Sequence, residues 1–530
     1  MIVDTKKSGP SEQKTAPDKR IVIGEKPLTV EDVCQVARRS ARLVLSQDKA
    51  FRRRITDGAA FLERLLEEDG RIYGVTTGYG DSCTVDIPKP LVEELPLHLT
   101  RFHGCGLGAY LSEEMARGVL VTRLASLAAG YSGVRWELLE RLALFINEGV
   151  VPLIPEEGSV GASGDLTPLS YVAALLVGER DALYEGACMP AAEIHRALGL
   201  EPLTLRPKEG LAIMNGTAMM TALACEAFTR ASYLTRLATR LTSLATVAID
   251  GNVYHFDERL FEAKPHPGQA QVAAWVRSDL ETGEPPRNAD RLQDRYSIRC
   301  APHVIGVLQD SLPWMRQFIE TELNSANDNP IVDGETEHVL HGGHFYGGHI
   351  AFAMDGLKTC VANISDLIDR QLALLVDTKF NNGLPANLSG VEGPRAAINH
   401  GFKAVQIGAS AWTAEALKLT MPASVFSRST ECHNQDKVSM GTIAARDCLR
   451  VLQLTEQVMA AHTLACVQAV TLRQRLGVGR ITFSGAFEEF AKDVSETFGF
   501  LDEDRPLETD LRCVTSFIQQ ARWQLYEGEA

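Results

Sequence analysis

The stretch TAMMTALACEAFTRASYLTRLATRLTSLATVAI, residues 217–249, is long, rich in apolar and small side chains, and free of glycine and proline. Glycine and proline destabilise a helix interior more than any other residue, so their absence over this length predicts one continuous helix. Apolar residues lie on most sides of that helix, which is typical of a helix buried in a protein core. We therefore expect a long central helix in an α-helical protein.

Other segments have apolar residues three and four positions apart, which is the helical pattern. They are residues 115–131, 136–150, 301–324, 349–377 and 441–476. Stretches with a β pattern are short, as at 20–24 and 338–343. Because long helices bury their apolar faces on one another, the predicted fold class is mainly α. We expect an elongated bundle of long central helices with a smaller, loop-rich N-terminal domain.

The predicted domain organisation follows from the position of these segments. The first residues are polar and lack the apolar core of a secretory signal, so we interpret them as a disordered leader. The predicted parts are the leader at 1–20, an N-terminal domain at 21–205, the central helix bundle at 206–478 and a C-terminal helical tail at 479–530.

The composition of the 530 residues excludes several classes of protein. The formal net charge of −15 argues against a nucleic-acid partner, because phosphate backbones select basic surfaces. It also gives no reason to expect docking on an anionic membrane, and no apolar run approaches the length of a membrane span. The 11 cysteines contain no CxxC pair, so reduced thiols in a cytoplasmic protein fit best.

Residues 158–171, GSVGASGDLTPLSY, concentrate glycine and serine directly before an expected helix. Such a turn can cradle a phosphate group. This one lacks the Lys-Ser/Thr end of a nucleotide-binding loop, so a nucleotide site is not predicted. The plain structural alternative is a turn followed by a helix that Thr167 caps, with Pro168 at its first position.

A chemical interpretation rests on the tripeptide Ala162-Ser163-Gly164. The amide nitrogen of Gly164 could attack the carbonyl carbon of Ala162 and close a five-membered ring. Loss of water from the ring and from Ser163 would leave an electrophilic methylidene group. The attacking residue must be glycine, because a β-carbon would obstruct so close an approach of the backbone. The middle residue must be serine, because its hydroxyl is lost.

Six segments together resemble the motifs of the aromatic amino acid ammonia-lyase and aminomutase family, which includes histidine, phenylalanine and tyrosine ammonia-lyases. They are GSVGASGDLTPLS, IYGVTTGYG, IMNGTAMM, QDRYSIRCAPHVIG, ELNSANDNP and HNQDKVSMG, and they follow the order of the family. The resemblance covers residues 70–445 and, through the helical flanks, most of the chain. It implies a methylidene-imidazolone formed from Ala162-Ser163-Gly164, no diffusible cofactor, and a cytoplasmic homotetramer with shared active sites.

The resemblance also implies roles for single residues. Tyr73 matches the base that removes a β-proton from the substrate, and Arg299 matches the arginine that binds the substrate carboxylate. Tyr296 lies three residues before Arg299, on the same helical face, and matches a second tyrosine near the ring. The substrate site further includes Gln293, Asn215, Asn327 and Phe345.

Taken alone, Tyr73 could equally be a core tyrosine and Arg299 a surface ion-pair partner. A free tyrosine has a pKa of about 10, which is too high for a base at neutral pH. We therefore expect positive helix ends or a cationic neighbour to lower the pKa of Tyr73.

Two places in the sequence bear on the substrate. Phe102 and His103 occupy the selectivity pair, where histidine lyases usually show Ser-His, tyrosine lyases His-Leu and phenylalanine lyases Phe-Leu. Phe102 favours a plain phenyl ring, whereas His103 departs from both aryl patterns and could donate to a ring hydroxyl. Gln435 aligns with a glutamate of histidine lyases, and Glu431 matches a glutamate near the amine in phenylalanine lyases. The prediction is elimination of ammonia from L-phenylalanine to trans-cinnamate.

Several alternatives stay open. They are a tyrosine ammonia-lyase, an aromatic aminomutase that yields a β-amino acid, a histidine ammonia-lyase and, in a different class, an inactive helical scaffold. In LHGGHFYGGH, Phe345 keeps the aromatic position of the family, while His344 and Tyr346 replace the usual asparagine and histidine. The glycine-rich spacing of His341, His344 and His349, without a nearby carboxylate, does not predict a metal site.

Overall fold

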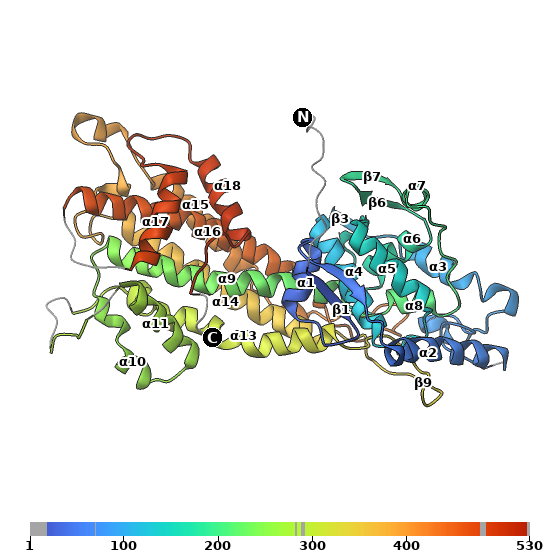
Figure 1. Cartoon of the computed structure of the whole chain (residues 1–530). Coiled ribbons are helices and arrows are strands. Elements are labelled where there is room, and N and C mark those ends of the chain that lie inside the picture. Colours follow the sequence, from blue (N-terminus) through green and yellow to red (C-terminus); the bar gives the residue numbers. More distant parts are fainter. Residues whose placement is uncertain (1–18, 69, 281–282, 288–291, 478–483, 527–530) are drawn as a thin grey trace. The chain divides into compact units, whose positions relative to one another are not determined.

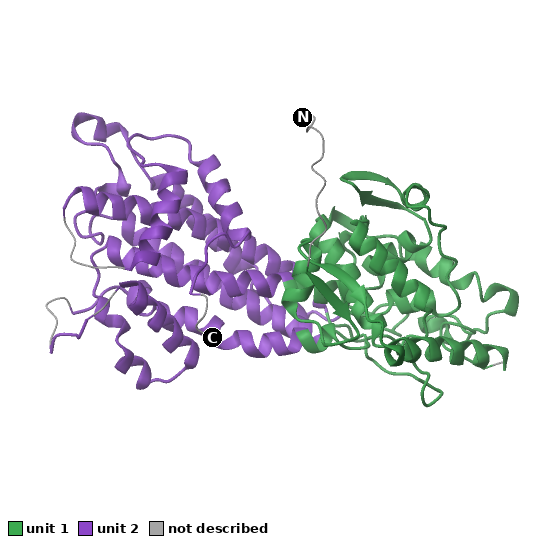
Figure 2. Ribbon diagram, in the orientation of Figure 1, with its two compact units in different colours: residues 1–225, 320–347, 428–439 green, residues 226–319, 348–427, 440–530 purple. Residues whose placement is uncertain are grey.

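The computed structural model describes residues 19–68, 70–280, 283–287, 292–477 and 484–526 (Figure 1). The chain forms two compact units, each assembled from three separate segments (Figure 2). Unit 1 comprises Met1–Cys225, Glu320–Gly347 and Arg428–Ser439. Unit 2 comprises Glu226–Ile319, Gly348–Ser427 and Met440–Ala530.

Unit 1 combines helices of moderate length with small sheets. Strands β1 (Arg20–Ile23) and β2 (Arg42–Leu45) pair in parallel, and the other strand pairs are antiparallel. These pairs join β3 (Leu107–Tyr110) to β5 (Pro155–Glu157), β4 (Val151–Pro152) to β6 (Asp181–Tyr184), β6 to β7 (Ala187–Pro190), and β8 (Ile331–Asp333) to β9 (His338–Leu340). The helices are α1 (Val30–Ala37), α2 (Lys49–Glu67), α3 (Leu95–Phe102), α4 (Glu113–Ala128), α5 (Trp136–Glu148), α6 (Leu166–Leu176), α7 (Ala191–Ala197) and α8 (Glu209–Met214).

Unit 2 is built from longer helices. They are most of α9 (Ala218–Ala248), α10 (Glu258–Glu262), α11 (Pro267–Leu280), α12 (Tyr296–Arg299), most of α13 (Ala301–Leu323), α14 (Gly348–Val376), α15 (Lys403–Lys418), α16 (Gly441–Arg475), α17 (Gly485–Phe498) and α18 (Glu508–Gln519). Helix α16 is buried along most of its length, because α14, α15 and α18 pack against it.

One buried ion pair joins two of these long helices. Arg230 on α9 donates from Nε and Nη2 to the two carboxylate oxygens of Glu456 on α16, at 2.8 Å each. A bidentate arginine–carboxylate contact fixes orientation as well as distance. The pair therefore sets how α9 and α16 are rotated against one another within unit 2.

The structure confirms the mainly α fold class and the expected long helices. The predicted helix at 217–249 is α9, and the segments at 301–324, 349–377 and 441–476 are α13, α14 and α16. Helix α4 begins at Glu113, before its predicted start at 115, because the Ser112 side chain accepts a hydrogen bond from the backbone N–H of Met115.

Other predictions about organisation have separate outcomes. The leader lies outside the described residues except for Lys19 and Arg20, and Arg20 already belongs to β1. The sequential division at residues 205 and 478 stays a prediction. No described helix combines the length and apolarity that a membrane span needs.

We predict that Leu357→Ala on α14 lowers the free energy of unfolding of unit 2 by about 2–5 kcal/mol, because the side chain is fully buried and its removal leaves a cavity. Chemical denaturation measures the change. The control is Leu260→Ala on α10, where the leucine is 52% exposed and the loss should be much smaller. Equal losses in the two variants would contradict the packing described here.

Candidate active site

Unit 1 contains a cavity of about 530 Å³. Nine residues predicted for the site line it: Tyr73, Phe102, His103, Ala162, Ser163, Asn215, Phe345, Glu431 and Gln435. These residues come from six segments that are far apart in the sequence. The fold of unit 1 therefore brings most of the predicted site together around the Ala-Ser-Gly turn.

The turn itself has an unusual backbone. Ser163 and Gly164 both have positive φ angles, 48° and 78°. Gly164 pairs with Gly216, whose backbone N–H donates to the Ser163 carbonyl at 3.1 Å. A β-carbon on Gly164 would lie 2.1 Å from the Gly216 carbonyl oxygen, so only glycine fits.

The residue after the turn anchors it to the next helix. The backbone N–H of Asp165 donates to the Gly216 carbonyl at 2.8 Å, and its carboxylate accepts from the backbone N–H of Met220 at 2.9 Å. Helix α6 begins at Leu166, directly after this contact. The alternative in which Thr167 caps the helix and Pro168 takes its first position is therefore wrong, because the helix has already begun before Thr167.

Tyr73 lies in the cavity wall beside the loop that follows it. Its hydroxyl oxygen accepts a hydrogen bond from the backbone N–H of Gly80 at 2.7 Å. Burial raises the pKa of Tyr73 above its ordinary value of 10.0, and the charge of Glu431 adds to this effect, while the Gly80 contact opposes it. The expectation of a lowered pKa is thus wrong for this chain, because burial of the phenol dominates and the charge of Glu431 raises the pKa further.

The selectivity pair lies at the end of α3. The rings of Phe102 and His103 are 4.5 Å apart, and both line the cavity. Burial lowers the pKa of His103 to about 4, and the positive charge of Arg180 contributes. The imidazole is therefore neutral at physiological pH and offers one N–H donor and one acceptor.

The loop that carries Glu431 and Gln435 is strained. Glu431, Cys432 and His433 follow one another with positive φ angles of 49°, 51° and 69°. The Glu431 carboxylate accepts from the backbone N–H of Asp81 at 3.2 Å, and Gln435 Oε1 accepts from the hydroxyl of Thr430, on the same loop, at 2.8 Å. Left-handed residues in succession are costly and tend to occur where a side chain must point in a set direction.

Asn215 and Asn327 have different surroundings. Asn215 lines the cavity, and its Nδ2 donates to the Asn329 carbonyl at 2.7 Å. Asn327 is buried outside the cavity lining, and its Oδ1 accepts from Arg123 and Ser126. Asn329 lines the cavity although we did not single it out from the sequence. Its place two residues after Asn327 in the same motif was the available signal.

Three predicted residues belong to unit 2 and are not among the residues that line the cavity. The guanidinium of Arg299 lies 4.5 Å from the ring centroid of Tyr296, and its Nη2 donates to Gln293 Oε1 at 3.4 Å. The predicted grouping of Tyr296 and Arg299 on one helical face is therefore present. Tyr296 is 72% exposed.

The chain matches the family model of aromatic amino acid lyases over residues 28–495 and belongs to that family. It is a carbon–nitrogen lyase, an enzyme that eliminates ammonia from an aromatic amino acid. The family resemblance of the sequence motifs is thereby confirmed. Among the described residues, no group of three or more His, Cys, Asp or Glu side chains could hold a metal ion.

Individual relatives carry different names. The chain is 35% identical to a histidine ammonia-lyase of Alkaliphilus oremlandii, with 94% of this chain and 97% of the relative covered. It is similar to the structure of a tyrosine aminomutase from Streptomyces globisporus, with a TM-score of 0.87, 34% identity, and 95% and 97% of the two chains covered. The phenylalanine aminomutase of Pantoea agglomerans has a TM-score of 0.87 at 29% identity, with 95% and 99% covered.

We predict that Glu431→Gln lowers the pKa of Tyr73, because a nearby carboxylate disfavours the phenolate. The tyrosinate absorbance of each protein, minus that of the same protein with Tyr73→Phe, should therefore rise at a lower pH in the variant than in wild type. Glu262→Gln on α10 is the control and should leave the titration unchanged. A Tyr73 pKa that is unaffected by Glu431→Gln would show that the charge of Glu431 does not act on it.

Proposed function

We propose that this enzyme converts L-phenylalanine to trans-cinnamate and ammonia, with a methylidene-imidazolone formed from Ala162-Ser163-Gly164 as its electrophile. The observation that carries the proposal is the contact of Gly164 with Gly216, directly beside the cavity-lining residues Ser163 and Asn215. A turn that no other residue at position 164 could adopt is what ring closure by a backbone nitrogen requires.

The residues fit such a ring, and its formation releases two molecules of water. A bond forms between the Gly164 nitrogen and the Ala162 carbonyl carbon, and the carbonyl oxygen leaves as water with the amide hydrogens of Gly164 and Ser163. The Ser163 hydroxyl leaves as a second water with the α-hydrogen of that residue. No oxidant is needed. Once formed, the ring supplies an electrophilic carbon that takes up the substrate amine.

Tyr73 is proposed to remove the β-proton. Its hydroxyl already accepts a hydrogen bond from the Gly80 N–H, and such a donor stabilises the phenolate that a base must reach. Because burial and Glu431 oppose that state in one chain, a positive charge near Tyr73 in the assembled enzyme would favour catalysis.

The proposed site for the phenyl ring is the apolar part of the cavity. Leu99, Phe102, Leu166 and Leu211 line it. An uncharged aromatic ring gains by burial against such side chains. The neutral His103 beside Phe102 adds no charge that would oppose a plain phenyl ring.

Two other substrates have an observation in their favour. Tyrosine is favoured by His103, since a neutral imidazole can hydrogen-bond a ring hydroxyl. Histidine is favoured by the similarity of the chain to the histidine ammonia-lyase of Alkaliphilus oremlandii. The tyrosine and phenylalanine aminomutases of similar structure also keep open a product in which ammonia returns to the β-carbon.

We further propose a homotetramer in which a second copy supplies Gln293, Tyr296 and Arg299. The residues that line the cavity include no arginine in the described part of the chain, although the substrate carboxylate calls for one. Leu292 and Tyr296 are both more than two-thirds exposed in the single chain, and apolar surface of this kind is usually covered by a partner.

The test of the substrate uses purified enzyme with L-phenylalanine, L-tyrosine or L-histidine, with products identified by absorbance and mass spectrometry. We expect cinnamate from phenylalanine, and Ser163→Ala should lower the rate by about a thousandfold or more because the electrophile is lost. Ser495→Ala on α17 of unit 2 is the control and should retain most of the activity, because its hydroxyl donates to the Lys492 carbonyl of its own helix. Coumarate, urocanate or a β-amino acid as main product would each overturn the proposed reaction.

The test of shared sites mixes two inactive variants, Tyr73→Phe and Arg299→Met, under conditions that allow subunit exchange. If the two residues act across chains, random mixed oligomers should regain about a quarter of wild-type activity, because each site needs one intact copy of each residue. Mixing Tyr73→Phe with Ser163→Ala serves as a comparison for residues that line one cavity of the same chain. No recovery with the Arg299 variant would contradict the shared site.

A further inference from the structure

The short helix α8 leads directly into Asn215 and Gly216, which back the Ala-Ser-Gly turn. It starts with two adjacent residues of opposite charge, Lys208 and Glu209, which are each 1% exposed. Lys208 has a φ angle of 76°, a conformation that a lysine adopts only under constraint. Both the burial of charge and the strained backbone cost free energy, so contacts with neighbouring elements must hold this helix start in place.

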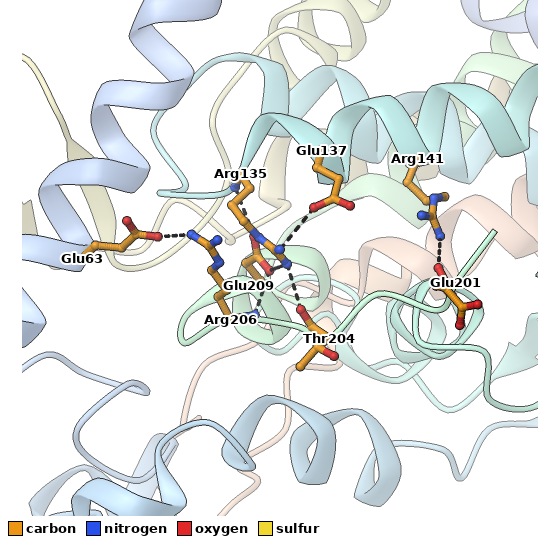
Figure 3. A network of polar contacts seen from close by, with 8 residues as sticks. All are labelled: Glu63, Arg135, Glu137, Arg141, Glu201, Thr204, Arg206 and Glu209. Carbon is orange, nitrogen blue, oxygen red and sulfur yellow. Dashed lines mark hydrogen bonds and ion pairs between the residues drawn. The ribbon is translucent and has the colours of Figure 1, made fainter.

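Glu209 connects the start of α8 to the start of α5. Its carboxylate accepts from Arg135 Nε at 2.9 Å and Nη2 at 2.7 Å, and from the backbone N–H of Arg206 at 2.8 Å (Figure 3). Figure 3 also shows Arg135 reaching Glu137 and the Thr204 carbonyl. The start of α8 is thus held against α5 by a set of charge-assisted hydrogen bonds.

Lys208 ties α8 to the turn at residues 327–329. Its Nζ donates to Asp328 Oδ2 at 2.5 Å, and both side chains are fully buried. At the other end of the helix, Asn215 donates to the carbonyl of Asn329 at 2.7 Å. Two attachments to one turn, one at each end of α8, fix both the position of the helix and its rotation.

Arg123 adds a third attachment in the middle. Its Nη2 donates to the Ala212 carbonyl of α8 at 2.5 Å, and its Nη1 donates to Asn327 Oδ1 at 3.2 Å. A β-carbon on Gly216 would lie 2.1 Å from Arg123 Nη1. The guanidinium therefore packs directly behind the glycine that faces Gly164.

The buried charges form a balanced set. Lys208 and Arg123 are positive, Asp328 and Asp165 are negative, and Arg123 interacts with both carboxylates. Asp165 is the residue directly after the reactive turn. A buried set of charges is tolerated when each charge has a partner, and its geometry then permits little movement.

We propose that Lys208, Asp328 and Arg123 are positioning residues for ring closure. They hold α8 in the place where Gly216 stays in close contact with Gly164. This inference rests on the proposed function, because it concerns formation of the ring from Ala162-Ser163-Gly164. The three residues touch neither the substrate nor the reacting atoms. They act through Gly216, which accepts from Asp165 and donates to Ser163 on the two sides of Gly164.

The experiment measures ring closure and not turnover. The proteolytic peptide that contains residues 162–164 loses two waters when the ring forms, and mass spectrometry follows that loss after synthesis of the full chain. In a double variant, Lys208→Met with Asp328→Leu, we expect closure about a hundredfold slower, because small misplacements of reacting groups have effects of this size. An apolar pair of similar volume often replaces a buried ion pair without loss of stability.

A matched control replaces the buried pair of unit 2, Arg230→Met with Glu456→Leu, and should close its ring at the wild-type rate. Circular dichroism and the oligomeric state establish that each protein is folded. If the Lys208 double variant does not fold, Asp328→Asn decides, because it keeps the shape of the side chain and removes only its charge. Wild-type closure rates in the folded variant overturn the positioning role alone. A wild-type protein that loses no water overturns the proposed function as well.

Discussion

The close contact between Gly164 and Gly216 is the constraint on which the rest of unit 1 depends. A β-carbon on Gly164 would meet the Gly216 carbonyl, and a β-carbon on Gly216 would meet the side chains of Arg123 and Asn327. Backbone hydrogen bonds from Gly216 to Ser163 and from Asp165 to Gly216 hold the two glycines together. Helix α6 cannot begin before Asp165, because the Ser163 carbonyl and the Asp165 amide are already hydrogen-bonded to Gly216. Such local strain persists only where the surroundings over-determine it. Helix α8 and the 327–329 turn are those surroundings.

Charge is distributed unevenly around this contact. Behind the turn, two cations and two carboxylates are buried and paired, whereas the cavity in front of it is lined by Glu431, Asp436, Lys437 and a neutral His103. Burial and the Glu431 charge raise the pKa of Tyr73, so a single chain offers a base in an unfavourable state. In the proposed assembly, an arginine of another copy would add a further positive charge and bind the substrate carboxylate. Assembly and catalysis are linked in that proposal.

Sequence reasoning succeeded where a property is local. The long segments with helical apolar periodicity became α9, α14 and α16, and nine motif residues line one cavity. It failed where a property depends on distant neighbours. The pKa of Tyr73 is raised because Glu431, remote in sequence, adds to burial, and Asn327 faces Arg123 while Asn329 faces the cavity. The burial of Lys208 could not be predicted from the sequence, because nothing in its neighbourhood along the chain shows it.

Helix periodicity, the Ala-Ser-Gly tripeptide and the ordered motifs were readable from the amino acids alone, because each depends on residues a few positions apart or on the covalent structure. The fold added the direction of each side chain, its burial and its partners. These set the contact behind Gly164 and the charge state of His103. Desolvation and Coulomb interactions act through space, so their strength at a residue is set by groups that tertiary packing brings near it.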